Sequence, residues 1–251
     1  MEGIVLRRID YGESDQIIKL FLKETGNISA IAKGIKRSKK RFPHRLEPFR
    51  VYDFTLRKRK PGQSLYLIQS ADQIHDFEGI KEDIRKIALG NFILEILLIA
   101  VKESHPHPEL YDFVLKTFRN LSESEGIFPL WFYVAIHVMG FLGFSPNFET
   151  CLKCKKPLQK TEKNLFNPAR GGLVCQQCAT LSKTDKTSVT SEALGVLQFL
   201  KKASFPAVPR IKLSSQTRTE IASLLTNFIT YHLERPLKTL PFLQEVLLKK
   251  K

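Results

Sequence analysis

The segment Gln16-Ile-Ile-Lys-Leu-Phe-Leu-Lys23, followed by Glu24-Thr25-Gly26 and then Asn27-Ile-Ser-Ala-Ile-Ala-Lys33, decides the fold of the N-terminal part of the chain. Both runs are rich in apolar and β-prone residues, and the Thr-Gly-Asn step between them is a turn signal. This pattern predicts two consecutive strands joined by a turn.

Three more β-prone runs lie on either side of this segment: Val5–Ile9, Phe49–Arg57 and Ser64–Ala71. Turn signals separate them at Tyr11-Gly12-Glu13-Ser14-Asp15 and at Lys60-Pro61-Gly62-Gln63. Five strands within about seventy residues predict a small β-barrel, and the OB-fold is the common five-stranded type. An SH3-like barrel would show the same periodicity, so that alternative stays open.

The sequence changes to a helical pattern from about Glu78, because apolar residues recur there at helical spacing. Predicted helices cover Ile80–Leu98, Pro108–Leu121, Pro129–Leu142, Ser191–Ala203 (with Ser191 as N-cap), Ser215–Leu233 and Phe242–Leu248.

All four cysteines of the chain fall in one short region, as Cys151-x2-Cys154 and Cys175-x2-Cys178 with 20 residues between the pairs. Two such pairs at this separation are typical of a zinc site, because each forms a tight knuckle and two knuckles complete a tetrahedron. Gly171-Gly172 before the second pair permits a close approach of the chain. Four thiolates leave no open coordination position, so the Zn²⁺ ion would be structural. Disulfides and reduced buried thiols are the alternatives, and disulfides require an oxidising compartment.

These observations predict an α+β fold with three parts. An OB-fold barrel is expected at residues 1–77, and an α-helical domain at 78–148 and 185–251. The zinc finger is expected at 149–184, inserted in the helical domain.

Charge is unevenly distributed along the chain, which has 40 basic and 25 acidic residues and a net charge of +15. Residues 33–60 hold 12 basic and 2 acidic side chains, and residues 151–251 hold 18 and 6. This surplus indicates a polyanionic partner, either nucleic acid or an anionic membrane surface. The N-terminus lacks a signal-peptide core, and the most apolar run, 87–101, is shorter than the ~20 residues of a membrane span. We therefore expect a soluble cytoplasmic protein with no membrane partner.

The basic segment after the third predicted strand is the strongest candidate for nucleic-acid binding, because cations that follow a phosphate backbone and aromatic rings that stack on bases suit single strands. Candidate DNA-binding residues are Lys33, Lys36, Arg37, Lys39, Lys40, Arg41, Arg57, Lys58 and Arg59. Candidate stacking residues are Phe42, Phe49, Tyr52 and Phe54. The alternative is a solvated charged loop whose neighbouring aromatics are buried in the barrel.

Motifs of catalysis are missing from the sequence, which has no phosphate-binding loop of the GxxxxGK[ST] type, no HExxH and no GxSxG. Asp10, Glu13 and Asp15 would suit a metal-dependent nuclease, but a polar turn between two strands explains them more simply. We therefore expect a binding protein and no enzyme. An RNA-binding or ribosome-associated zinc-ribbon protein is the main alternative, since OB barrels and cations serve RNA equally well.

Several short motifs, taken in order along the whole chain, resemble the RecO family of bacterial recombination mediators. They are Tyr11-Gly12-Glu13, Lys33-Gly34-Ile35-Lys36-Arg37, Leu46-Glu47-Pro48-Phe49, Leu142-Gly143-Phe144-Ser145-Pro146, the two cysteine pairs with Gly171-Gly172, and Tyr231-His232-Leu233. Leu22 and Thr239 depart from the family pattern, where Thr and Ser are expected.

This resemblance implies a nucleoid-associated protein that binds single- and double-stranded DNA and anneals complementary strands. It also implies three protein partners: RecR, the acidic C-terminal tail of the single-stranded-DNA-binding protein, and indirectly RecA, which it helps to load. An acidic tail with an apolar end requires an apolar groove with a cation at its rim. Candidate tail-binding residues are Phe113, Lys116, Phe118 and Arg119.

Overall fold

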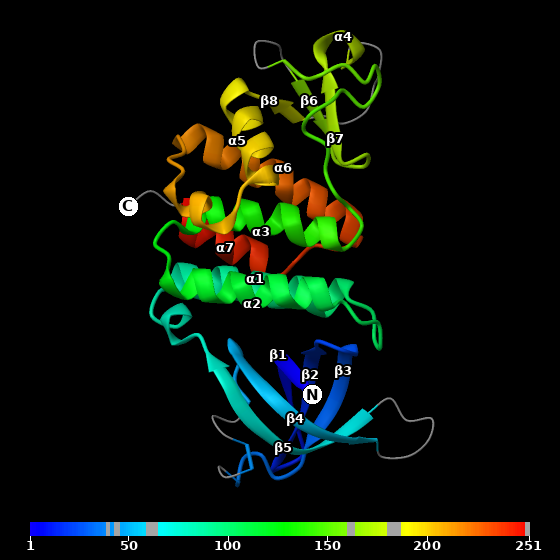
Figure 1. Ribbon diagram of the computed structural model, residues 1–251, viewed down its shortest axis with the longest axis vertical. Coiled ribbons are helices and arrows are strands. Elements are labelled where there is room, and N and C mark those ends of the chain that lie inside the picture. The colour runs from blue at the N-terminus through cyan, green and yellow to red at the C-terminus, as the bar shows by residue number, and fades with distance from the viewer. Residues whose placement is uncertain (39–40, 43–45, 59–64, 160–163, 180–186, 249–251) are drawn as a thin grey trace. The chain divides into compact units, whose positions relative to one another are not determined.

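The structure is a computed structural model that describes residues 1–38, 41–42, 46–58, 65–159, 164–179 and 187–248 (Figure 1). The chain forms two compact units, Met1–Glu123 and Ser124–Lys251. No helix in the described part of the chain is both long and apolar enough to cross a membrane. The predicted division into a barrel domain (1–77), a helical domain (78–148 and 185–251) and a zinc finger (149–184) stays a prediction. Position 185 and the predicted turn at 60–63 lie outside the described residues.

A closed five-stranded barrel begins the first unit (Figure 1). Its strands are β1 (Glu2–Tyr11), β2 (Asp15–Leu22), β3 (Gly26–Ala32), β4 (Arg50–Lys58) and β5 (Leu65–Asp76). The order around the barrel is β1-β2-β3-β5-β4, with β3 and β5 parallel and the pairing of β1 with β4 closing the ring. This arrangement confirms the predicted OB-type barrel.

The barrel interior is filled by apolar residues from alternating strand positions, as the period of a β-strand requires, and by three residues of the connection between β3 and β4. The core residues are Val5, Ile18, Leu20, Leu22, Ile28, Ala30, Ala32, Ile35, Phe42, Leu46, Tyr52, Phe54, Ile68 and Ala71. At the turn between β2 and β3, Gly26 has a φ of +78°, and a Cβ there would lie 2.0 Å from the His105 carbonyl oxygen. Only glycine fits this close approach.

The short 3-10 helix η2 (Glu78–Ile80) and helices α1 (Ile84–Ala100) and α2 (Pro108–Glu123) complete the first unit. Helix α1 packs against β1 and β2, and the Asn27 side-chain amide in β3 donates to the carbonyls of Leu97 and Val101 at 2.8 Å each. The predicted helix from Ile80 is interrupted, because Asp83 is extended and accepts a hydrogen bond from the Arg85 N–H as the N-cap of α1.

The buried guanidinium of Arg50, with 4% of its side chain exposed, joins the barrel to η2. It pairs with Asp76 at 2.6 Å, with Glu78 at 3.4 Å and with Glu47. A buried cation is tolerated only when it is paired in this way.

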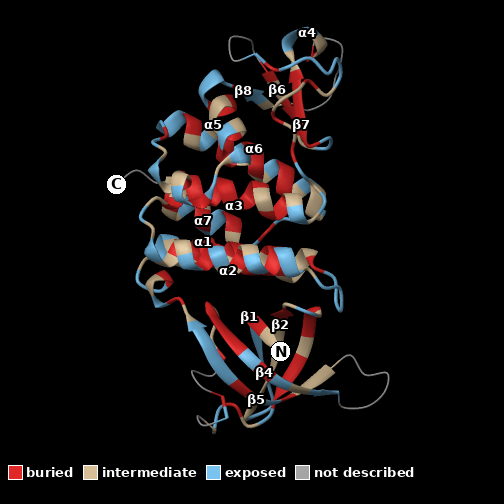
Figure 2. Ribbon diagram, in the orientation of Figure 1, coloured by how far each residue is buried: buried red, intermediate tan, exposed pale blue. Residues whose placement is uncertain are grey.

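The second unit contains helices and a short three-stranded sheet. Its elements are α3 (Ile127–Phe141), β6 (Asn164–Asn167), β7 (Gly172–Cys175), α4 (Gln176–Ala179), β8 (Thr187–Val189), α5 (Ser191–Lys202), η3 (Phe205–Arg210), α6 (Ser215–Leu233) and α7 (Thr239–Leu248), with sheet order β7-β6-β8. Helix α3 is buried along most of its length, where it packs against α5, α6 and η3 (Figure 2).

The predicted helix starts differ from the observed ones at three places in the second unit. Helices α3 and α7 begin two and three residues earlier than predicted. Pro129 and Pro241 lie in the first turns of these two helices, where the missing N–H of a proline needs no partner. The N-cap of α5 is Thr190, whose side chain accepts from the Ala193 N–H, so the predicted Ser191 cap is wrong by one residue. The helix predicted at Ser215–Leu233 is confirmed.

Candidate metal centre and nucleic-acid interface

The first cysteine pair lies on a tight knuckle before β6. The Cys151 N–H donates to the Lys156 carbonyl at 2.9 Å, and the Lys155 N–H donates to the Cys151 carbonyl at 3.0 Å. Lys155 has a left-handed φ of 61°, which turns the chain back on itself. The knuckle therefore points the sulfurs of Cys151 and Cys154 to the same side.

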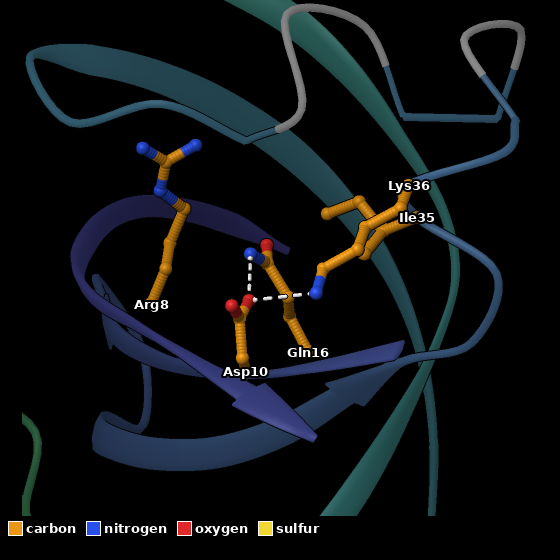
Figure 3. A pocket seen from close by; sticks show the side chains of 5 residues that line it. All are labelled: Arg8, Asp10, Gln16, Ile35 and Lys36. Carbon is orange, nitrogen blue, oxygen red and sulfur yellow. Dashed lines mark hydrogen bonds and ion pairs between the residues drawn. The ribbon is translucent and has the colours of Figure 1, made fainter. Parts of the chain in front are cut away.

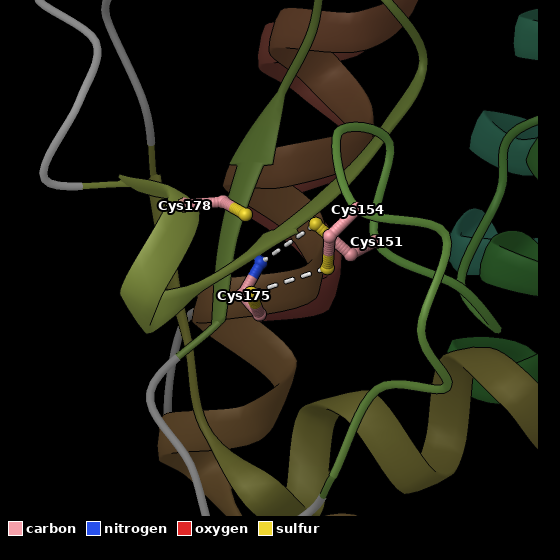
Figure 4. A group of neighbouring side chains, drawn as sticks. All are labelled: Cys151, Cys154, Cys175 and Cys178. Atoms are coloured by element: carbon pink, nitrogen blue, oxygen red, sulfur yellow. Dashed lines mark hydrogen bonds between the residues drawn. The ribbon is translucent and has the colours of Figure 1, made fainter.

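The second pair lies where β7 ends and α4 begins, so that Cys175 is the last residue of the strand and Cys178 lies one helical turn later. The Leu152 N–H donates to the Leu173 carbonyl at 2.8 Å, which fixes the first knuckle against β7. The four cysteine side chains thus gather at one place (Figure 4).

The sulfur geometry fits a single tetrahedral ion. All four Sγ atoms lie within 4.8 Å of one another, and those of Cys154 and Cys175 are 3.9 Å apart. A metal–sulfur distance of about 2.3 Å corresponds to sulfur separations of about 3.8 Å in a tetrahedron. Within the described residues, these cysteines form the one group of three or more ligand side chains that are close enough to hold a metal ion.

The electrostatics of the four thiols favour a bound cation. Burial alone would raise the pKa of Cys151, yet hydrogen bonds from the N–H groups of Cys154, Cys175 and Lys153 lower it to about 6. Burial and hydrogen bonds with the other sulfurs raise the pKa of Cys178 to about 12. Four neighbouring thiols resist full ionisation by themselves, and a divalent cation compensates the crowded negative charge.

The finger is anchored to helix α6 of the same unit. The His232 Nε2 atom lies 3.1 Å from the Pro168 carbonyl oxygen, and the Phe228 ring contacts Phe166 edge-on. Gly171 has a φ of +59°, and a Cβ there would lie 3.0 Å from the Phe228 ring. The predicted role of this glycine, a close approach of the chain before the second knuckle, is confirmed.

The predicted DNA-binding cations that the structure describes are all exposed, and we call these six residues the barrel cations: Lys33, Lys36, Arg37, Arg41, Arg57 and Lys58. Lys39, Lys40 and Arg59 lie outside the described residues. The barrel cations come from the loop after β3 and from the end of β4. Arg41 links the two places, because its Nε–H donates at 3.4 Å to the carbonyl of Gln69 in β5, the partner strand of β4.

Two barrel cations are already paired with carboxylates of the β1–β2 hairpin. The Lys36 Nζ atom lies 3.3 Å from Asp10, and an Arg37 guanidinium nitrogen lies 3.8 Å from Glu13. Both pairs are solvent-exposed, so each contributes little to stability. Both pairs place the loop after β3 beside the hairpin.

The predicted stacking role of the aromatic residues is wrong. The side chains of Phe42, Phe49, Tyr52 and Phe54 are all buried, with at most 5% exposed. Strand alternation turns Tyr52 and Phe54 inward on β4, whereas Phe42 and Phe49 lie in the connection before that strand and are covered by packing. Their burial agrees with the alternative interpretation, a charged loop whose neighbouring aromatic residues are buried. Tyr11 lies at the end of β1 and is 55% exposed, so it is an exposed aromatic side chain that the sequence analysis did not include among the stacking candidates.

The acidic residues of the first turn are engaged in hydrogen bonds and ion pairs. Asp15 accepts from the Gly34 N–H at 2.8 Å and from the Ser14 hydroxyl at 3.1 Å, and the Gly34 hydrogen bond holds the pKa of Asp15 below its usual range. Asp10 and Glu13 pair with cations, as described above. This arrangement supports the simpler explanation of these carboxylates, a polar turn.

The predicted tail-binding residues lie on α2, but they do not all face solvent. Lys116 and Arg119 are exposed and Phe113 is half-buried. Phe118 is fully buried, with its ring edge-on to Phe49 at 5.9 Å between ring centroids. Phe118 therefore belongs to the core of the first unit and is unavailable to a surface groove.

Comparison with known proteins covers both units. Residues 1–77 match the family described as Recombination protein O N terminal, and residues 81–241 match Recombination protein O C terminal. The DNA repair protein RecO of Syntrophus aciditrophicus is 29% identical over 246 residues, which cover 98% of this chain and 95% of the relative. That of Caldanaerobacter subterraneus is 30% identical over 244 residues, covering 96% and 95%.

Proposed function

The chain belongs to the Recombination protein O family, and from this premise we propose that it is a mediator of DNA repair and homologous recombination. In this proposal it binds single- and double-stranded DNA and anneals complementary strands that are coated by single-stranded-DNA-binding protein. Together with RecR it helps to load RecA, in the bacterial cytoplasm at the nucleoid. It acts by binding and positioning, without catalysing a covalent reaction.

The observation that carries the proposal is the group of exposed barrel cations on an OB-type barrel. Contacts of Lys and Arg with phosphates release counterions and carry little sequence information. If about five phosphates are engaged, log K should fall with log salt at a slope near −3.5 for single strands. Binding should therefore be largely independent of sequence, apart from any contact with the bases.

Annealing requires that two strands are held close together while their charges are neutralised. The segments 33–60 and 151–251 both carry a large positive surplus, and they belong to different compact units. We propose that each unit binds one strand, after which base pairing joins them.

The cysteine site is proposed to hold one structural Zn²⁺ ion on Cys151, Cys154, Cys175 and Cys178. When bound, the ion would fix the two knuckles, and four thiolates would leave it no position for substrate. In the same proposal, Lys116, Arg119 and Phe113 remain candidates for contact with the acidic tail of the single-stranded-DNA-binding protein.

The decisive experiment is annealing of two complementary labelled oligonucleotides, with and without a saturating coat of single-stranded-DNA-binding protein. Annealing that persists through the coat supports the mediator function. Tight DNA binding without annealing would contradict it. Equal affinity for RNA together with an absence of annealing would favour an RNA-binding zinc-ribbon protein instead.

A further inference from the structure

A hollow of about 470 Å³ lies between the β1–β2 hairpin and the loop after β3 (Figure 3). The side chains that line it are those of Arg8, Asp10, Gln16, Ile35 and Lys36. Arg8 and Asp10 share one face of β1 because alternate residues of a strand point to the same side. Gln16 is the partner of Asp10 across the β1–β2 ladder.

Backbone hydrogen bonds fix the two walls of this hollow relative to each other. The Lys36 N–H donates to the Ser14 carbonyl at 3.1 Å, and the Gly34 N–H donates to the Asp15 carboxylate at 2.8 Å. Ile35 lies between these two anchor points and adds an apolar wall. The backbone of the two walls is therefore held in place before any ligand binds.

Asp10 places a negative charge among cations that are proposed to contact phosphates. Its Oδ1 atom accepts from the Gln16 amide at 2.8 Å and pairs with Lys36 at 3.3 Å. The hydrogen bond from Gln16, followed by the contacts with Lys36, holds the pKa of Asp10 below its usual range. An ionised carboxylate repels phosphate, but it is a good acceptor for the N–H groups of a nucleobase.

Three of the polar atoms in the hollow, the two Asp10 carboxylate oxygens and the Lys36 ammonium nitrogen, form a row, and Gln16 donates to the carboxylate oxygen in the middle. Figure 3 shows one Asp10 oxygen directed toward Gln16 and Lys36 and the other on the far side. The row thus consists of acceptor, acceptor and donor, the last being the Lys36 ammonium. A complementary ligand presents two adjacent donors followed by an acceptor.

Among the four DNA bases, guanine has this pattern on its Watson–Crick edge, with the 2-amino group, N1–H and O6. Adenine, cytosine and thymine each lack two adjacent donors on that edge. We infer that this hollow is a guanine-recognition site within the single-strand-binding surface, in which Asp10 accepts from the base and Lys36 donates to O6. The inference rests on the proposed DNA binding and adds a base preference to it.

The test is fluorescence anisotropy with short oligothymidines that carry a single central guanine, inosine or adenine. Inosine lacks only the 2-amino group, so it isolates one of the two hydrogen bonds to Asp10. A bidentate contact of this kind changes affinity by roughly 5- to 140-fold. We expect the guanine strand to bind more tightly than the adenine strand by a factor near the lower end of that range, and the inosine strand to bind with an intermediate affinity. The substitution Asp10→Asn should remove this preference.

The matched control is Glu13→Gln. This substitution also removes one carboxylate from the β1–β2 hairpin, but the Glu13 carboxylate pairs with Arg37 and does not line the hollow. It should raise affinity for all strands equally and keep the guanine preference. Equal binding of guanine and inosine strands by the unmodified protein, or a preference that survives Asp10→Asn, would overturn the inference alone. Absence of binding to every strand would overturn the proposed DNA binding as well.

Discussion

The Sγ atom of Cys154 lies 3.9 Å from that of Cys175, although 20 residues separate them in the sequence. The two knuckles meet because β7 carries Cys175 to the place where Leu152 is hydrogen-bonded to Leu173. A metal ion held by all four cysteines would therefore couple metal binding to folding of the finger.

Substitution Cys175→Ser should remove the metal and unfold the finger, because a site with three thiolates holds the ion much more weakly. The metal content, measured by elemental analysis, should fall from about one ion per chain to well below that ratio. Hydrogen exchange should accelerate at Leu173 and Val174 while barrel amides such as that of Ile18 stay protected. Loss of protection in both units, or full metal content in the variant, would contradict this prediction.

Reversal of Lys36, Arg37, Lys39 and Lys40 to Glu should abolish annealing while the fold is retained. Each lost phosphate contact should reduce the magnitude of the salt slope by about 0.7. Binding titrations over a range of salt concentrations measure the slope, and circular dichroism checks the fold. The control is Lys102→Glu, which reverses an exposed cation in the segment 71–150, where 12 acidic side chains outnumber 6 basic ones. Unchanged annealing in the fourfold variant would refute the role of this loop.

Substitution Arg50→Met should destabilise the protein by about 3–5 kcal/mol, since removing one partner of a buried ion pair leaves the others uncompensated. Urea unfolding followed by circular dichroism measures the change. The control is Arg85→Met, which removes a half-exposed ion pair with Asp83 and should cost at most about 1 kcal/mol. Equal losses of unfolding free energy in the two variants would show that the buried Arg50 ion pairs stabilise the protein no more than an exposed ion pair does.

The second unit should lose stability as the pH falls below 6.5. Burial lowers the pKa of His137 from its ordinary value of 6.5, so the unfolded chain takes up a proton more readily than the folded one. The stabilisation is therefore present above pH 6.5 and is lost as the pH falls toward the lower pKa of the folded state. Fluorescence of Trp131, the one tryptophan of the chain, reports thermal unfolding of this unit. The substitution His137→Gln should flatten the pH dependence of the unfolding temperature. Burial also lowers the pKa of His232, so a part of the dependence should remain. An unaltered profile would contradict the assignment of the pH dependence to His137.

Periodicity and motif spacing predicted the strands, the main helices and the four cysteines that gather. These features depend on local pattern: the helix at Ser215–Leu233, for example, begins after a Ser cap and carries its own apolar stripe. The barrel type was less certain from sequence, because strand order depends on pairings between distant segments such as β3 and β5.

Side-chain direction and long-range contacts could not be predicted in the same way. Phe42 follows Arg41 and Phe118 precedes Arg119 in the sequence, yet both phenylalanine side chains are buried. Burial of a side chain depends on the packing around it and not on the charge of its sequence neighbour. The hollow around Asp10 and Lys36 forms only when the loop after β3 lies on the β1–β2 hairpin. No short motif encodes that contact.

The pairing of β1 with β4 closes the barrel, so that each of its five described strands has a neighbour on both sides. Unpaired edges are where sheets of neighbouring molecules join and aggregate. A protein proposed to crowd along a DNA strand brings many copies of its barrel into contact. Closure therefore lets these barrels be packed at high local density without polymerising through their sheets.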